Sequence, residues 1–120
     1  MAGPSIVPPK FEGNFADWKR RMEVFLRIDF EIRFIMKYGF VAPMNQDGEE
    51  KEESHWTKKE QNESVANSRA EYHLLSVLPP QEVNRIGSYS SAKELWEKFL
   101  ELHEGTLKRS SQEETSSGTS

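Results

Sequence analysis

The stretch Phe11–Leu26, FEGNFADWKRRMEVFL, decides the fold of this chain. Indexed at about 100° per residue, its apolar side chains share one helical face: Phe15, Trp18, Met22, Phe25 and Leu26. Asn14 precedes the run and Asp17 follows three residues later, which is typical of a helix N-terminus. The stretch therefore predicts an amphipathic core helix rather than a ligand site built from aromatic rings.

The composition bounds the class of protein. The chain has 120 residues, a length that suits one domain, and only 35% of them are hydrophobic. A net charge of −4 and a pI near 5.4 argue against a dedicated nucleic-acid binder. The absence of cysteine excludes disulfides, thiolate zinc sites and a cysteine nucleophile. No signal peptide or membrane-spanning segment is evident in the sequence, which predicts a cytoplasmic location.

The second apolar segment, residues 29–39, admits two interpretations. Its residues alternate in part as in a strand, yet Phe30, Phe34, Ile35 and Tyr38 share one helical face. Asp29 can cap the start and Gly39 can end the segment. We favour a helix, because no second strand is available nearby to pair with.

A polar loop is predicted between residues 40 and 54. Pro43, Asn45 and Gly48 are turn formers, and the run Glu49–Glu53 is mostly acidic. Its spacing does not match that of a calcium loop, so we interpret it as a solvated loop.

The longest predicted helix, 57–78, opens with the capping box of Thr57 and Glu60 and ends at Pro79-Pro80. It carries one apolar stripe of Val65, Tyr72 and Leu75 and a second of Ala66, Ala70, Leu74 and Val77. Two stripes predict that its C-terminal half is the most buried helical segment.

Two further helices are expected at 80–87 and 91–104, where the first begins at Pro80 and the second at a capping box, Ser91 to Glu94. The fold class is therefore all-α, a small bundle of five helices near 14–27, 30–38, 57–78, 80–87 and 91–104. An extended arm (1–9) precedes the helical domain (10–105), and a Ser/Thr/Glu-rich tail (106–120) is expected to be disordered.

No pattern of catalytic or metal-binding residues is visible. The three histidines, His55, His73 and His103, form no ligand pair, and no serine sits in a nucleophile elbow. We expect no enzyme activity, cofactor, metal or small-molecule ligand. Lys19, Arg20, Arg21 and Arg27 cluster on the first helix, and a solvated basic face is favoured over an RNA track.

With its elements in order, the chain resembles the N-terminal part of the Gag polypeptide of plant copia-type LTR retrotransposons. The resemblance covers residues 7–106, and no single tripeptide within it is specific. It rests on these residues: Lys10–Phe15, Trp18, Arg21-Met22, Leu26, Gly39, Pro43, His55–Thr57, Ala66, Leu75–Leu78, Ser91–Lys98 and His103–Thr106.

The resemblance implies a helical, capsid-like domain with a structural role, in which Gag chains associate into a particle that packages RNA. The family pattern continues into further capsid helices and a Cys/His zinc knuckle. This chain departs from it after Thr106 and has no cysteine. We therefore expect a truncated Gag fragment without specific nucleic-acid binding or membrane association. Its partners would be itself, as a weak dimer, or longer Gag chains.

A second interpretation, from another class, is a host-retained Gag-derived adaptor that binds an unrelated protein. The candidate core is Phe15, Trp18, Met22, Phe25, Leu26, Tyr72, Leu75, Leu95, Trp96 and Phe99. The candidate interaction surface is the wide apolar arc of the last helix: Leu95, Trp96, Phe99, Leu100 and Leu102. The sequence names no host partner.

Overall fold

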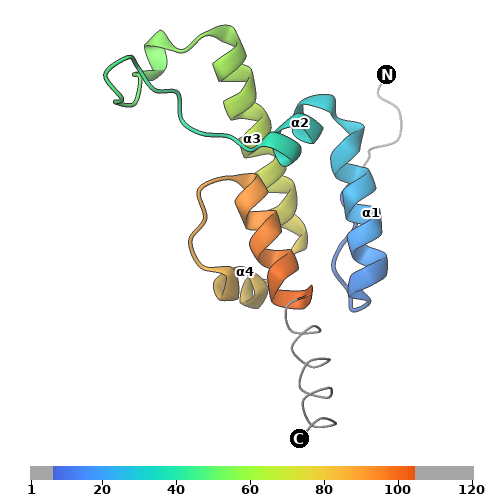
Figure 1. The fold of residues 1–120 in the computed structure, drawn as a ribbon. Helices are drawn as coiled ribbons and strands as arrows, with labels where there is room; N and C mark the ends of the chain where they lie inside the picture. Colours follow the sequence, from blue (N-terminus) through green and yellow to red (C-terminus); the bar gives the residue numbers. More distant parts are fainter. Residues whose placement is uncertain (1–6, 105–120) are drawn as a thin grey trace, which may run out of the picture.

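The computed structural model describes residues 7–104, which form an all-helical bundle (Figure 1). Its elements are α1 (Phe15–Ile28), α2 (Phe30–Tyr38), the 3₁₀ turn η1 (Glu53–His55), α3 (Lys58–Val77), α4 (Pro80–Ile86) and a C-terminal helix described over residues 92–104. Each helix begins within one residue of its predicted start. Within the described residues, the only β structure is an isolated bridge between Met44 and Glu50. The all-α fold class is confirmed, and the ambiguous second segment is a helix.

Each of the three predicted segments falls partly or wholly outside this range. The tail at 106–120, the first six residues of the arm at 1–9 and the last residue of the domain at 10–105 lie outside the described residues.

Local hydrogen bonds explain where the helices begin and end. Asn14 Oδ1 accepts from the backbone amide three residues on, at 2.9 Å, which caps α1. Thr57 Oγ1 accepts from the Glu60 amide at 3.1 Å, and the Glu60 carboxylate accepts from the Thr57 amide at 2.8 Å, so the capping box of α3 is complete. Gly39 ends α2 at φ 84°, a left-handed conformation that favours glycine. These are short-range interactions, which is why the sequence predicts them.

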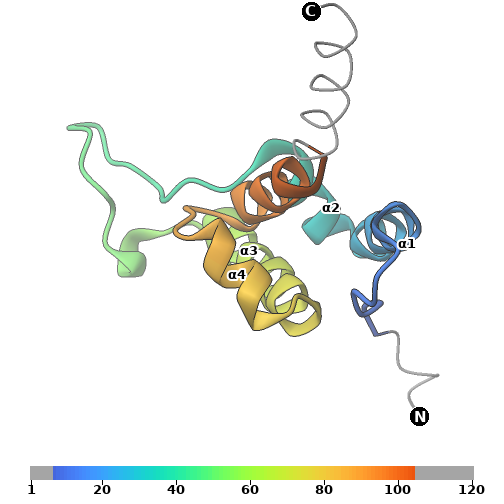
Figure 2. The same ribbon diagram turned by 90° about the horizontal axis from the view of Figure 1, so that it is seen from below.

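The C-terminal helix packs beside α3 and toward α1 (Figures 1 and 2). Its Leu95 and Phe99 are fully buried. The Phe99 ring meets the Trp18 ring of α1 edge-on, with centroids 5.3 Å apart, and Trp96 lies 5.7 Å from Trp18. Toward α3, the Ala92 amide donates to Asn67 Oδ1 at 2.9 Å. One helix therefore joins α1 to α3 through aromatic packing on one side and a side-chain cap on the other.

The segment before α1 is fastened to the bundle by Trp18. Its indole Nε1 donates to the Pro9 carbonyl oxygen at 2.7 Å, and the Phe11 amide donates to the Val77 carbonyl oxygen at 3.4 Å. The Phe11 ring also lies 5.2 Å from Trp18. The end of the predicted arm, at Pro9, thus packs against the helical domain.

Of the residues proposed for the core, two are misplaced. Trp18, Met22 and Leu26 are buried, as are the three from the last helix, while Phe15 and Phe25 are half-buried against the same cluster. Tyr72 is 69% exposed and Leu75 is 38% exposed, so assigning them to the core was wrong.

The reason for this error lies in how α3 packs. Its second stripe, with Ala66, Ala70 and Leu74, is fully buried, and the two alanines let neighbouring helices approach closely. The stripe that carries Tyr72 and Val65 faces away from the core and is exposed. The expectation that the C-terminal half of α3 would be the most buried helical segment is therefore wrong, because the C-terminal helix is more completely buried.

The segment between α2 and α3 is a loop with internal order, which extends away from the bundle in both views (Figures 1 and 2). The Trp56 indole donates to the Lys51 carbonyl oxygen at 3.3 Å, and the Lys51 amide donates to the Pro43 carbonyl oxygen at 2.9 Å. The Lys51 ammonium is 3.2 Å from the Glu60 carboxylate. Trp56 thus organises this loop.

Candidate protein-interaction surface

The surface predicted from the last helix is not available in this structure. Leu95 and Phe99 are fully buried and Trp96 is 8% exposed, while Leu100 and Leu102 are half-buried against the same cluster. Their wide apolar arc is covered because α1, α3 and α4 surround it. This prediction was wrong, since a wide arc indicates several neighbours and those neighbours lie within this chain.

The exposed apolar surface lies instead on α2. Phe30 is 73% exposed and Tyr38 is 63% exposed, and Phe34 between them is half-buried. Spaced four residues apart, these rings form one line along the helix, which we call the aromatic stripe. The Phe34 and Tyr38 rings are 4.8 Å apart. An aromatic line of this kind, left uncovered by the described residues, is typical of a binding surface.

The opposite face of α2 explains why the stripe faces outward. Ile32 and Ile35 are buried, and only one side of a nine-residue helix can face the core. The sequence places apolar residues on both sides of α2, and the packing against α3 selects the isoleucine side. The sequence-based grouping of Ile35 with the three aromatic residues therefore does not hold.

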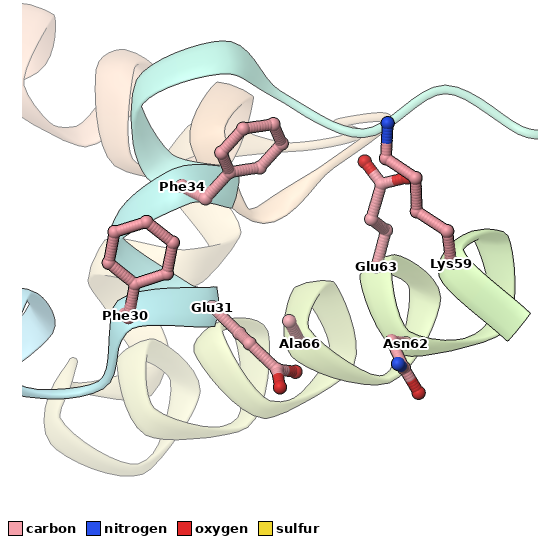
Figure 3. A pocket seen from close by; sticks show the side chains of 7 residues that line it. All are labelled: Phe30, Glu31, Phe34, Lys59, Asn62, Glu63 and Ala66. Atoms are coloured by element: carbon pink, nitrogen blue, oxygen red, sulfur yellow. The ribbon is translucent and has the colours of Figure 1, made fainter.

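A groove of about 400 Å³ runs between the aromatic stripe and the first half of α3 (Figure 3). Phe30 and Phe34 line one side, and Lys59 and Glu63 project from the other. The buried Ala66 lies between the two sides, and its small side chain leaves the groove hollow. Glu31 and Asn62 complete the lining. Aromatic walls with a few charged groups at the rim suit an apolar side chain of a protein partner.

Asp29 fixes the orientation of α2 relative to α3. Its carboxylate accepts from the Glu31 amide at 2.9 Å and the Ile32 amide at 3.3 Å, which caps α2. The same carboxylate is 2.5 Å from the guanidinium of Arg69 on α3. Both partners are partly exposed, so the ion pair contributes at most about 1 kcal/mol, and its role is mainly geometric.

The ionisable groups with shifted pKa lie outside the groove. Burial lowers the pKa of His73, and the nearby Arg69 charge lowers it further. Burial and a hydrogen bond to the Glu71 carboxylate raise the pKa of Tyr89 to about 12. A hydrogen bond to Glu104 raises the pKa of Lys19. Each of these groups joins neighbouring parts of the bundle and none faces the aromatic stripe.

The histidines occupy three separate places. His73 meets the Phe25 ring edge-on at 4.9 Å, His103 stacks on Phe15 at 4.7 Å, and His55 is exposed in η1. His103 Nε2 also lies 3.2 Å from the Glu82 carboxylate. Among residues 7–104, no group of three or more His, Asp or Glu side chains could hold a metal ion. Over the same range, no helix combines the length and the apolar character needed to cross a membrane.

Comparison of this chain with protein-family models, with curated proteins and with solved structures returned no match. The function is therefore inferred from the residues themselves and from the surface that they form.

Proposed function

We propose that this chain is a structural, non-enzymatic interaction protein: a capsid-like domain resembling copia-type retrotransposon Gag, which associates with copies of itself or with longer Gag chains. Two observations support the proposal. The ordered motifs of the sequence resemble that family, and the fold is an all-α bundle, the class that the resemblance implies. The aromatic stripe of α2 carries the proposal, because Phe30 and Tyr38 expose most of their surface and Phe30 lines an open groove.

The physical argument is the burial of apolar surface. Each large aromatic side chain can bury roughly 150–250 Å², worth about 25 cal/mol per Å². Ile28 is also exposed and lies two residues before Phe30. A partner that covers this region would gain several kcal/mol, which is enough for weak association once the entropy of binding is subtracted.

The proposal is tested by the concentration dependence of mass in sedimentation equilibrium or light scattering. We expect the average mass of the wild-type protein to rise above that of a monomer as its concentration increases. The double variant Phe30→Ser/Tyr38→Ser should associate more weakly than the wild type, and both changes are at exposed positions, so the fold should be retained. Val41→Ser is the matched control, because Val41 is 81% exposed but lies in the loop. Association of the double variant equal to that of the wild type would contradict the proposal.

A strictly monomeric wild-type protein would instead favour the second candidate, an adaptor that binds an unrelated protein. The observation that favours an adaptor is the rim of the groove, where Glu31, Glu63 and Lys59 surround an apolar hollow. Such a rim suits an amphipathic helix with its own charged edges. Isolating binders with the wild type and with the Phe30→Ser/Tyr38→Ser variant as baits would show whether the aromatic stripe is the binding surface.

A further inference from the structure

A second pocket, distinct from the groove, lies where α1, α2 and the C-terminal helix meet. Its volume is about 320 Å³. Its apolar part is formed by Leu26, Met36 and Trp96. Its charged groups are three cations and one carboxylate: Arg27, Arg33, Lys37 and Glu23. We call this site the basic pocket, and it is positively charged although the whole chain carries a net charge of −4.

The cations of the basic pocket lack partners within the described part of the chain. Other cations form ion pairs there, such as Arg69 with Asp29 and Lys19 with Glu104. Among residues 7–104, the side chains of Arg27 and Arg33 form no ion pair or hydrogen bond, and the Lys37 ammonium lies over the Tyr38 ring at 5.2 Å. Unpaired cations grouped around an apolar floor indicate a site for an anionic ligand.

The loop between α2 and α3 carries the complementary charge. Its acidic side chains are exposed and form no ion pair among the described residues: Asp47, Glu49, Glu50, Glu52 and Glu53. The one cation in this run, Lys51, is already paired with Glu60 at 3.2 Å. Met44, which bridges to Glu50, is 50% exposed and offers an apolar side chain among the acids. We call residues 44–53 the acidic loop.

The acidic loop is ordered before any partner binds. Asn45 Oδ1 accepts from the Asp47 and Glu49 amides, both at 2.9 Å, and the Trp56 indole holds the Lys51 carbonyl. A loop held in one shape loses less entropy on docking than a mobile one. The acidic loop also extends away from its own bundle (Figures 1 and 2), which leaves it free to reach a second copy.

We propose that the acidic loop of one copy docks in the basic pocket of a second copy. Carboxylates of the loop meet Arg27, Arg33 and Lys37, and Met44 covers the apolar floor. This contact is heterologous, because it joins two different surfaces, and it therefore propagates from copy to copy. The inference rests on the proposed self-association and adds to it a second contact, distinct from the aromatic stripe.

Nucleic acid suits the basic pocket less well. Trp96 is only 8% exposed, so its ring offers no face on which a base could stack. The chain as a whole is acidic and repels a polyanion at long range, whereas a short acidic loop meets mainly the local field of the pocket.

Charge reversal on each side tests the proposal. The pocket variant is Arg27→Glu/Arg33→Glu, and the loop variant is Glu49→Lys/Glu50→Lys/Glu52→Lys. All five positions are exposed, so both variants should fold. In about 50 mM salt, we expect each variant alone to associate at least about tenfold more weakly than the wild type, because like charges then face each other. An equal mixture of the two should recover association. The acidic pocket of the pocket variant then faces the basic loop of the loop variant, and the two unchanged surfaces also remain complementary.

Arg20→Glu is the matched control, because it reverses an exposed cation of α1 outside the pocket. Raising the salt to about 500 mM should weaken the loop–pocket contact and leave the apolar contact of the aromatic stripe in place. The mixture failing to recover association, or both reversal variants associating like the wild type, would overturn this proposal while leaving the proposed function intact.

The proposed function fails separately if the wild-type chain stays monomeric at every concentration and salt tested. Binding of a fluorescent single-stranded RNA by the wild type, lost in the pocket variant, would also overturn the loop–pocket contact by assigning the pocket to nucleic acid.

Discussion

Replacement of Trp18 by alanine is the sharpest test of the packing. Trp18 is 3% exposed, and its ring lies 5.2–5.7 Å from those of Phe11, Phe99 and Trp96. Its indole is also the donor that fastens Pro9 to the bundle. The substitution therefore removes an aromatic contact among three segments and one hydrogen bond at the same time.

The expected loss follows from the buried area. Burying an indole removes roughly 200 Å² from water, worth at most about 5 kcal/mol at about 25 cal/mol per Å². The alanine side chain still buries part of that area, which reduces the loss of unfolding free energy. The cavity and the lost hydrogen bond to Pro9 increase the loss by about 1 kcal/mol or more. We expect Trp18→Ala to lower the free energy of unfolding by about 3–5 kcal/mol, out of a total of roughly 5–10 kcal/mol for a domain of this size.

The measurement is urea and thermal unfolding followed by far-ultraviolet circular dichroism, which does not depend on the removed tryptophan. The midpoint temperature should fall by at least about 12 °C. Tyr72→Ala is the matched control: this aromatic residue is exposed, and its loss should change stability by no more than about 0.5 kcal/mol. The buried position of Trp18 would be incorrect if Trp18→Ala unfolded like the wild type, or if Tyr72→Ala destabilised the fold as much as Trp18→Ala.

Two further predictions concern single interactions. Thr57→Ala should lower the free energy of unfolding by about 1 kcal/mol in urea titrations, because it removes the N-cap of α3, whereas Thr57→Ser should retain stability close to that of the wild type. The pKa of Tyr89 is raised to about 12 in the fold, so the unfolded chain loses this phenolic proton first and stability falls as pH rises from about 10 to 12. Tyr89→Phe should make that decline shallower, and an unchanged decline would show that Tyr89 does not cause it.

The sequence determined where the helices lie because the signals that place them are local. Asn14, Asp29 and Thr57 each cap a helix with their own side chains, and Gly39 and Gly87 end two helices in left-handed conformations. A cap hydrogen bond joins residues two or three positions apart, so it forms in much the same way whatever surrounds the helix. The buried stripe of α1 was predictable for a similar reason, since α1 has a single apolar face built on Trp18.

The candidate surfaces depended on contacts between distant parts of the chain. Arg27 was recognised in the sequence as one of a basic group on the first helix, but only the fold brings it to one pocket with Arg33 and Lys37. The order of the loop between α2 and α3 likewise comes from Trp56, whose indole reaches back five residues to Lys51.

Only the tertiary structure decided which apolar stripe of a two-sided helix is buried. Both α2 and α3 carry two such stripes, and hydrophobicity alone favours burying the aromatic ones, with Phe30 or Tyr72. The structure buries Ile32 and Ile35 on α2 and the alanine stripe on α3, because small and branched side chains let the helices pack closely. Burial is a property of a residue and its neighbours together, and in this bundle the neighbours come from distant parts of the chain.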